Sequence, residues 1–562
     1  MRTKNFRPRF FRSVFLVAVA AATLALLASA PQTRPSAQTS PDRRIRLDTV
    51  GYPPGRAKRA TVAAPFKEFS VVREPDGAVV LRGRAQGPVR NDDTDESLYV
   101  ADFSTLDAPG AYRLEVAGLG RSAPFRVGRD VYANAFRAAF TAMYLWRCGT
   151  AVSAVHEGVT YSHAACHLGD ARLDFVGDGT ARRDATGGWH DAGDYNKYVV
   201  NAGVTVGVML RAWEDFGARI ERIKLDAHAP GSAPPAYLAE IKWETDWLLK
   251  MQRADGSVHH KVSTKDFGPA VQPEEEKTDR YFTDWSTAAT ADFAAVLASA
   301  ARAFRPHDDS YARRCLAAAR RAQEFLSAHP ENRRADLTGF TTGAYQTDDA
   351  DDRLWAAAEL WEATGERAHL AEFERRARAF PVKFDADWGW GNVKNLGMIT
   401  YLDSRRHGRD PALVRELRSA LKAAADRIVR LRDAHGYARP LARYYWGANG
   451  GVANTTVLLH AAQRAAPNVA YVETALDALH HLLGRNYYGR SFVTGVGFDP
   501  PRRPHDRRSM GQPGRATWPG YLVGGGWPRA TDWADEEENF RVNEIAINWN
   551  APLIYALAAA LD

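Results

Sequence analysis

Two aspartates in a glycine-rich turn have the types and spacing that most clearly suggest chemistry. Asp191 and Asp194 lie three residues apart in segment 187–195, which reads GGWHDAGDY. Glycine permits a tight turn or the close approach of another group, so both carboxylates can point into one cleft. There they can share a water molecule, one taking its proton while the other helps to hold it. A helix N-cap beside a solvated Asp, or a calcium loop, is the alternative interpretation.

A third acid, Glu544, lies far along the chain between an acidic loop and an apolar segment. The loop includes residues 535–538, which read DEEE, and the apolar segment begins at Ile545. Poor solvation among Trp and Ile side chains favours the neutral carboxyl group and raises its pKa. A Glu that stays protonated near neutral pH can donate a proton to a leaving oxygen. The alternative is a Glu that only complements the dipole of the following helix.

A loop upstream of Glu544 carries further polar groups. His505 and Arg507 lie two residues apart in segment 501–509, PRRPHDRRS. They can donate hydrogen bonds to sugar hydroxyls, or they belong to a solvated basic loop. The following stretch 511–528 is rich in Gly, Trp and Pro, and its length without regular structure predicts the wall of an active site.

The N-terminus has the features of a secretory signal peptide over residues 1–30. Basic residues precede an apolar run from Ser13 to Leu27, and Ala28-Ser29-Ala30 is a cleavage site of the A-x-A type. A polar, flexible leader follows over residues 31–43, and no later run approaches the length of a membrane span. We therefore expect a secreted protein, extracellular or periplasmic, with no membrane segment in its mature form.

The net charge of +7 says little about partners, because five of the positive charges belong to the signal segment, which has no acidic residue. The remainder, about +2, gives no reason to expect binding to nucleic acid or to a membrane surface. The 15 Trp and 21 Tyr residues agree better with sugar stacking, although core packing accounts for most aromatic side chains in any protein.

The elements that must position these groups fall into two regions. Residues 44–128 alternate polar and apolar side chains between turn signals, which predicts a small β-sandwich of immunoglobulin type. Residues 130–562 show helical periodicity and have room for about twelve helix-plus-loop units. Closing these units into a double ring buries the apolar face of every helix and brings the first and last units together.

The ordered motifs resemble those of glycoside hydrolase family 9, in the branch with an N-terminal immunoglobulin-like domain. The similarity covers about 44–562 and rests on GWHDAGD at 188–194 and NEIAINWNA at 543–551. It also includes WLLKMQ at 247–252, STAATADF at 286–293, YWGAN at 445–449 and SFVTGVG at 491–497. This resemblance implies an (α/α)6 barrel that hydrolyses β-1,4-glucosidic bonds with inversion.

The resemblance also assigns roles by position. Asp194 becomes the general base, Asp191 its partner in holding the water, and Glu544 the general acid. The set that would bind sugar is His505, Arg507, Tyr445 and Trp446, the last two as stacking platforms. Many members have Asp where this chain has Asn539; this removes a charge near the site and leaves the three acids intact.

Metal sites are expected at two places. Cys148, Cys166, His167 and His190 offer two thiolates and two imidazoles, enough for a closed tetrahedral zinc site, and related enzymes of this branch carry such a zinc. Its role would be structural, and a Cys148–Cys166 disulfide is the rival interpretation. The branch also uses calcium, for which the oxygen ligands would be Asp349, Asp351 and Asp352, beside Asp348. We expect no organic cofactor.

The combined prediction is a secreted, monomeric endoglucanase whose substrate is a β-glucan or a cello-oligosaccharide. An exo-acting enzyme of the same family, removing glucose or glucosamine from chain ends, is the closest alternative. A catalytically silent carbohydrate-binding protein is the alternative from a different class. Retention of Asp191, Asp194 and Glu544 together favours an enzyme.

Overall fold

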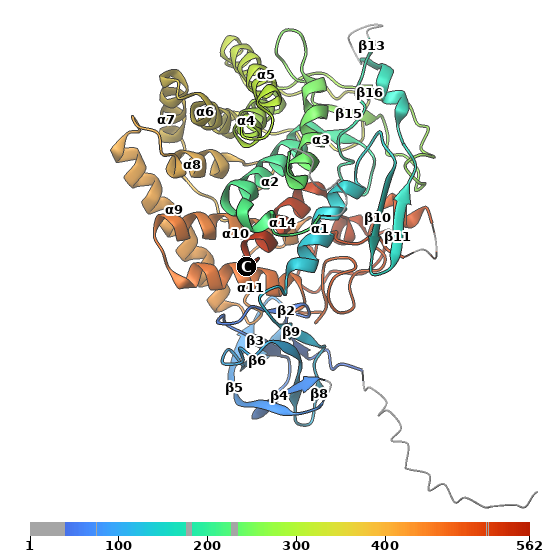
Figure 1. Cartoon of the computed structure of the whole chain (residues 1–562), viewed down its shortest axis with the longest axis vertical. Helices are drawn as coiled ribbons and strands as arrows, with labels where there is room; N and C mark the ends of the chain where they lie inside the picture. The colour runs from blue at the N-terminus through green and yellow to red at the C-terminus, as the bar shows by residue number, and fades with distance from the viewer. Residues whose placement is uncertain (1–39, 75, 176–181, 226–233, 513, 515) are drawn as a thin grey trace, which may run out of the picture. The chain divides into compact units, whose positions relative to one another are not determined.

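The computed structural model describes residues 40–74, 76–175, 182–225, 234–512, 514 and 516–562 (Figure 1). From Pro41 to Asp562 they belong to one compact unit. The expected signal peptide at 1–30, and most of the expected leader at 31–43, lie outside the described residues. None of the described helices is long and apolar enough to cross a membrane.

The N-terminal β-domain contains nine strands in the order β1-β3-β6-β5-β4-β7-β9-β2, with β8 on β7. The long strand β5 pairs with β4 through its first half and with β6 through its second half. Alternate side chains face inward, so Val71, Leu114 and Phe125 meet in one core. The strands are Ile45–Arg46 (β1), Gly51–Tyr52 (β2), Arg59–Val62 (β3), Glu68–Glu74 (β4), Val79–Asn91 (β5), Glu96–Asp102 (β6), Gly110–Val116 (β7), Gly120–Arg121 (β8) and Phe125–Val127 (β9).

The rest of the described chain is mainly helical, and twelve of its helices have ten residues or more. Two helices of four residues, Arg507–Met510 (α12) and Phe540–Asn543 (α13), lie in loops near the predicted site. The long helices are Ala133–Leu145 (α1), Val199–Ile220 (α2), Ala236–Met251 (α3), Thr287–Phe304 (α4), Asp309–Ala328 (α5), Ala350–Thr364 (α6), Arg367–Ala379 (α7), Lys394–Asp403 (α8), Pro411–Ala434 (α9), Ala448–Ala465 (α10), Val469–Leu482 (α11) and Ile547–Ala559 (α14).

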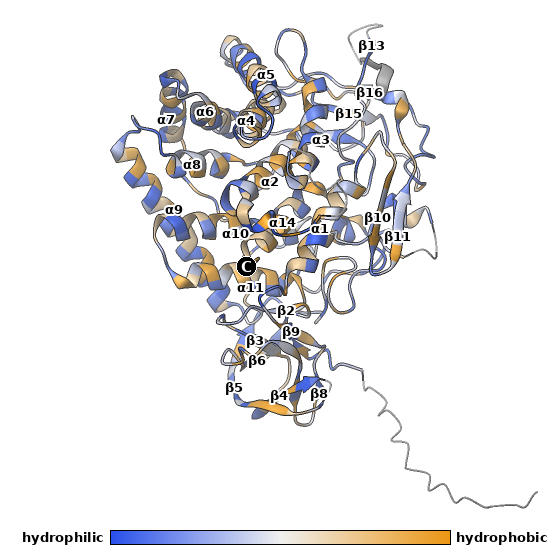
Figure 2. Ribbon diagram, in the orientation of Figure 1, coloured by the Kyte–Doolittle hydropathy of each residue, from blue (hydrophilic) through white to orange (hydrophobic). Residues whose placement is uncertain are grey.

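The helices form two layers. The inner helices α2, α4, α6, α8, α10 and α14 are buried along most of their length, whereas α5, α7 and α9 bury one face only. Figure 2 shows the corresponding alternation of polar and apolar residues along α5 and α9. Alanine side chains in α4 allow close packing against α2 and α6. The ring closes where α14 packs against α2.

Buried hydrogen bonds join the β-domain to the helical domain. Thr61 Oγ1 in β3 donates to the Gly436 carbonyl oxygen at 2.9 Å and accepts from Arg485 Nε at 3.0 Å. Asn91 Oδ1, at the end of β5, accepts from the Gly436 backbone N–H at 3.0 Å. Because Gly436 precedes the loop that carries Tyr445 and Trp446, the β-domain holds one end of that loop.

Short strands in the loops complete the framework around the predicted site. Val152–His156 (β10) and Val159–His163 (β11) form a hairpin. A five-stranded sheet has the order β13-β12-β16-β15-β14. Its strands are Leu173–Phe175 (β12), Arg182–Arg183 (β13), Lys197–Tyr198 (β14), Lys261–Thr264 (β15) and Arg280–Phe282 (β16). Strand β14 leads directly into α2, so this sheet supports the segment that carries Asp191 and Asp194.

Candidate active site and metal centre

The loop that bears the two aspartates is held at both ends by backbone hydrogen bonds. The Asp191 N–H donates to the Asn196 carbonyl oxygen at 3.0 Å, and the Ile547 N–H, at the start of α14, donates to the Asp191 carbonyl oxygen at 2.9 Å. Between the acids, Gly193 lies so close to the 505–507 segment that a Cβ there would be 2.3 Å from the His505 carbonyl oxygen. Glycine is therefore required at this position by close backbone approach.

Each aspartate accepts two side-chain hydrogen bonds. Asp194 Oδ2 accepts from Asn196 Nδ2 at 2.7 Å and from the Tyr198 hydroxyl at 3.1 Å. Its Oδ1 accepts no hydrogen bond from the described residues, so it can take up a proton. Asp191 Oδ1 accepts from Asn201 Nδ2 at 2.7 Å, and Asp191 Oδ2 from the Tyr345 hydroxyl at 2.8 Å.

Burial and the charge of neighbouring acids raise the pKa values of Asp191 and Glu544. Burial, together with the charge of Asp194, raises the pKa of Asp191 to about 8. Burial also raises the pKa of Glu544 well above its ordinary value, and Asp194 and Asp191 add to the shift. Glu544 accepts a hydrogen bond from Trp446 Nε1 at 3.1 Å. The site therefore contains a Glu544 whose surroundings favour the protonated form and an Asp194 whose Oδ1 is open to a proton donor.

The three acids line one cavity of about 350 Å³, together with Tyr198, Tyr345, Trp390, Trp446 and Trp549. An adjoining cavity of about 430 Å³ shares Trp390, Trp446 and Trp549 with it and adds Tyr445. Trp446 is 45% exposed, so its ring can contact a ligand. The cleft therefore extends beyond the acids along a surface rich in aromatic rings.

The other two predicted sugar-binding residues, His505 and Arg507, lie close to the acids, but their side chains contact other groups. His505 forms a backbone bridge with Glu544, and its Nδ1 lies 2.6 Å from the Glu537 carbonyl oxygen. Arg507 Nε donates to the Gly268 carbonyl oxygen at 3.1 Å, and its guanidinium group lies over the Phe267 ring. Neither side chain is among those that line the 350 Å³ cavity.

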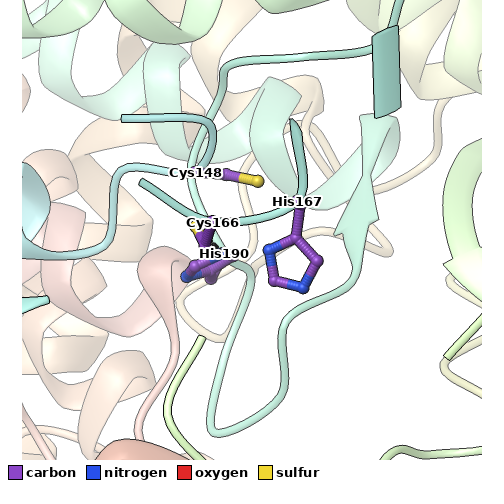
Figure 3. Close-up of side chains that lie close together, drawn as sticks. All are labelled: Cys148, Cys166, His167 and His190. Atoms are coloured by element: carbon purple, nitrogen blue, oxygen red, sulfur yellow. Dashed lines mark hydrogen bonds between the residues drawn. The ribbon is translucent and has the colours of Figure 1, made fainter. Parts of the chain in front are cut away.

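Figure 3 shows that the four predicted zinc ligands converge from separate loops. Four ligand atoms lie within 4.8 Å of one another, one each from Cys148, Cys166, His167 and His190. No other group of three or more possible metal ligands occurs among the described residues. Cys148 follows α1, Cys166 and His167 follow β11, and His190 directly precedes Asp191. Both cysteines are free thiols in this structure, not the alternative disulfide.

The side chains fit a metal ion at this centre. His167 Nε2 is 2.8 Å from Glu276 Oε2, while its buried Nδ1 has no partner among the described residues. A carboxylate at one ring nitrogen orients histidine for a metal at the other. Burial opposes ionisation of Cys148, but a hydrogen bond from Cys166 and the charge of Lys197 outweigh it and lower the pKa of this thiol. Two sulfur and two imidazole ligands suit tetrahedral zinc.

The aspartates expected to bind calcium point to different partners. Asp349 pairs with Arg353 at 2.8 Å, and Asp351 Oδ2 accepts from the Val393 N–H at 2.6 Å. Asp352 is buried beside Asp292 of α4. The described residues do not form a metal-binding group here, and the calcium site stays a prediction.

Several residues of the site were not predicted from the sequence. Asn196 and Tyr198 belong to the stretch YNKY that follows the acid pair, so their position in the chain is a signal that could have identified them. Asn201 lies in the first turn of α2, on the side that faces the loop. Tyr345 and Trp390 lie in distant loops without a recognisable pattern.

Comparison with known proteins identifies the family. A model described as Glycosyl hydrolase family 9 matches residues 132–557, and one described as Cellulase N-terminal ig-like domain matches 40–121. This chain belongs to glycosyl hydrolase family 9. Membership confirms the expected family and the helical-barrel fold with an immunoglobulin-like domain.

Named relatives support this assignment over nearly the whole chain. Endoglucanase D of Acetivibrio thermocellus is 52% identical over 525 residues, which cover 93% of this chain and 84% of the relative. A xyloglucan-specific endo-β-1,4-glucanase of Bacteroides ovatus is 31% identical, with 94% and 95% covered. A metagenome-derived family 9 endoglucanase has a similar solved structure, with 34% identity, a TM-score of 0.85, and 92% and 98% covered. Another, described as a Zn-binding triple mutant of a family 9 endoglucanase, has 35% identity, a TM-score of 0.84, and 91% and 99% covered.

Proposed function

We propose that this family 9 hydrolase is an endoglucanase that cleaves β-1,4-glucosidic bonds of cellulose or related β-glucans with inversion. The observation that carries this proposal is one cavity lined by Glu544, whose pKa is raised by burial, and by Asp194, whose Oδ1 accepts no hydrogen bond from the described residues. The names of the relatives at 52% and 31% identity support the substrate class.

In this mechanism, Asp194 Oδ1 accepts a proton from a water molecule while Asp191 helps to hold that water. The water attacks the anomeric carbon from the face opposite the leaving group. Glu544 donates its proton to the glycosidic oxygen as the bond breaks. Inversion needs this arrangement, with the base and the acid on opposite sides of the bond and a water molecule between base and sugar.

Binding of the glucan chain is assigned to the aromatic surface and to neighbouring donors. Trp446 and Tyr445 supply stacking surface along the two adjoining cavities. His505 and Arg507 lie beside Glu544 and Gly193, from where a small side-chain movement would bring them to sugar hydroxyls. A cleft that continues past the acids favours an endo mode of action over removal of single end units.

The zinc centre has a structural role in this proposal. When bound, zinc would cross-link the loop of His190 to the segments of Cys148, Cys166 and His167. The ring of four protein ligands leaves no open position for a water molecule or substrate. Export through the N-terminal segment, a monomeric state and a calcium site remain parts of the proposal that rest on the sequence.

A time course of products from amorphous cellulose and cellopentaose, with the purified mature protein, tests the activity. Mixed short cello-oligomers that appear early from cellulose are the expected result. Glucose alone from cellopentaose, or glucosamine from chitosan oligomers, would instead show exo action. No product from any of these substrates would support the carbohydrate-binding alternative.

Substitution of the acids tests their roles. Asp194→Ala and Glu544→Gln should each lower kcat by at least about 100-fold without loss of folding, because positioned acid–base groups supply that much or more. Glu538→Gln is the matched control, since Glu538 is an exposed acid in the loop before Glu544. Full activity of both test variants would refute the assignment.

A further inference from the structure

Lys261 in β15 is a buried ammonium group with no carboxylate partner in the part of the chain that the structure describes. Its side chain is fully buried, and it forms no ion pair with any described residue. The other buried lysines of the described chain, Lys58, Lys197, Lys383 and Lys394, each lie within ion-pair distance of an Asp or Glu. Burying a charge without a counter-charge is costly, so a fold keeps one only where other contacts compensate.

The hydrogen-bond acceptors of the Lys261 ammonium group all lie in one short segment. Its Nζ donates to Thr342 Oγ1 at 2.8 Å and to the Gly343 carbonyl oxygen at 2.9 Å. Gly343 in turn donates its backbone N–H to the Tyr198 hydroxyl at 3.2 Å. Lys261 is also the register partner of Tyr198 across β14 and β15, and its Nζ lies 5.5 Å from the centre of the Tyr198 ring.

This geometry connects Lys261 to both aspartates of the site. Tyr198 donates to Asp194, and Tyr345, two residues after Gly343, donates to Asp191. The Tyr198 and Tyr345 rings contact each other with 4.9 Å between centroids. A single ammonium group therefore holds together the two segments that supply these hydroxyl donors.

We propose that Lys261 is a positioning residue for catalysis, which fixes segment 342–345 against Tyr198 and so orients the donors to Asp194 and Asp191. The proposal rests on the proposed roles of these acids. Lys261 does not line the cavity, so it acts through its neighbours and not on the substrate.

The charge of Lys261 is a second part of the same role. Burial lowers the pKa of Lys261 to about 8, an effect that the charge of Asp194 opposes, so the ammonium form predominates at acidic and neutral pH. A nearby positive charge favours the ionised form of a general base. The other titratable or charged groups around the three acids come from the loop of Asp191 and Asp194, β14, the 342–345 segment, the 505–507 loop and the residue after α13. They are Asp191, Tyr198, Tyr345, His505, Arg507 and Glu544. Lys261 and Arg507 are the cations in this set.

The test compares Lys261→Met with Lys383→Met on cellopentaose. Lys383 is a matched control because it is also buried and donates to backbone carbonyl oxygens, those of Ala377 and Phe380, far from the acids in sequence. For Lys261→Met we expect a fall in kcat of about 10- to 100-fold with KM little changed, since misplaced catalytic groups cost rates of that order. The acid limb of the profile of kcat/KM against pH should also move to higher pH, by about one unit. Lys383→Met should lower Tm without moving that limb.

A third variant separates the effect of the Lys261 charge from the effect of its hydrogen bonds to segment 342–345. Lys261→Gln can still donate to the Gly343 carbonyl oxygen, so it should keep more of kcat than Lys261→Met while its acid limb moves by the same amount. If Lys261→Met does not fold, Thr342→Val, which removes one acceptor of the ammonium group, should lower kcat in the same direction.

Three results would overturn the proposal. The first is an unchanged kcat and an unchanged pH profile in folded Lys261→Met. The second is a loss of kcat in Lys261→Met that its lower Tm explains fully, as in Lys383→Met. The third is an unchanged kcat in Thr342→Val when Lys261→Met does not fold. The two proposals fail separately. Inactivity of the wild type on every glucan refutes the proposed function, whereas a wild-type rate in Lys261→Met refutes the role of Lys261 alone.

Discussion

At the residue scale, Asp194 and Glu544 are both carboxylic acids, and their surroundings suit them to opposite tasks. Asp194 Oδ1 accepts no hydrogen bond from the described part of the chain, and Tyr198 and Asn196 donate to its Oδ2. Glu544 is buried beside two other acids and receives one indole N–H. In the proposed mechanism, these local environments allow Asp194 to accept a proton while Glu544 donates one.

A substitution of Trp446 tests the state of Glu544 through pH. The Trp446 hydrogen bond lowers the pKa of Glu544, against burial and the neighbouring acids, which raise it. Activity that needs protonated Glu544 is present at low pH and is lost as pH rises through that raised pKa. Trp446→Phe should therefore move the basic limb of the kcat/KM profile to higher pH, by about one unit.

Trp390→Phe is the control for this shift. Trp390 lines the same cavity but forms no hydrogen bond to either acid among the described residues, so its loss should weaken substrate binding and leave the basic limb in place. A basic limb that moves down in Trp446→Phe, or moves equally in both variants, would contradict the assigned state of Glu544.

The sequence was informative about individual residues where they belong to a compact motif. The three acids lie within short, recognisable motifs, whereas the four Cys and His residues were predicted from their residue types and the family resemblance. Tyr345 donates to Asp191 from roughly 150 residues away, and Lys261 reaches the Tyr198 ring from roughly 60 residues away. Only the folding of the chain brings these segments together, and no local pattern of residue types predicts such contacts.

At the scale of elements, the four proposed zinc ligands converge beside the loop that carries the two aspartates. His190 precedes Asp191 directly, and the other ligands come from segments after α1 and after β11. The helices were predicted because their apolar periodicity extends over ten or more residues. The strands β12 to β16 were not, because a run of two to four residues is too short to display a period.

Loss of a zinc ligand should act on stability before it acts on chemistry. Cys148→Ala should lose bound zinc and show a lower Tm, because metal binding to the folded chain contributes folding free energy. Cys315→Ala is the control, since Cys315 is also a buried free cysteine but lies in α5. Zinc content and thermal unfolding with and without a chelator measure the effect.

In this experiment the chelator should lower the Tm of the wild type and of Cys315→Ala, and should leave that of Cys148→Ala unchanged. Activity should decline only as the structure loosens. Immediate loss of activity on chelation with an unchanged Tm would mean that the metal takes part in the chemistry.

At the scale of the whole molecule, the β-domain is joined to the helical domain by buried polar contacts at Thr61 and Asn91. Two regions of different periodicity were apparent from the sequence, and the family models match each of them. Their contact was not predictable, because it depends on single polar side chains that meet groups about 375 and 345 residues away.

The Thr61→Val variant should show how much this junction contributes to the free energy of unfolding. Valine keeps the shape of threonine but leaves the Gly436 carbonyl oxygen and Arg485 short of a buried partner, at a cost of about 1–3 kcal/mol. Thr105→Val in the same domain is the control, since Thr105 is exposed. Denaturant unfolding of the full chain provides the comparison, and equal stability of the two variants would show that the junction contributes little.

The hydrogen bond from the Ile547 N–H to the Asp191 carbonyl oxygen has a consequence for how this protein acquires activity. Asp191, the acid proposed to hold the water, is anchored by the first residue of α14, so the proposed reaction centre is complete only when the ring has closed. Contacts between segments so distant along the chain form late, because the entropy cost of closing the long loop between them precedes any gain from the contact. A nascent or partly folded molecule should therefore be catalytically silent, and the appearance of hydrolysis during refolding would report the completion of the fold itself.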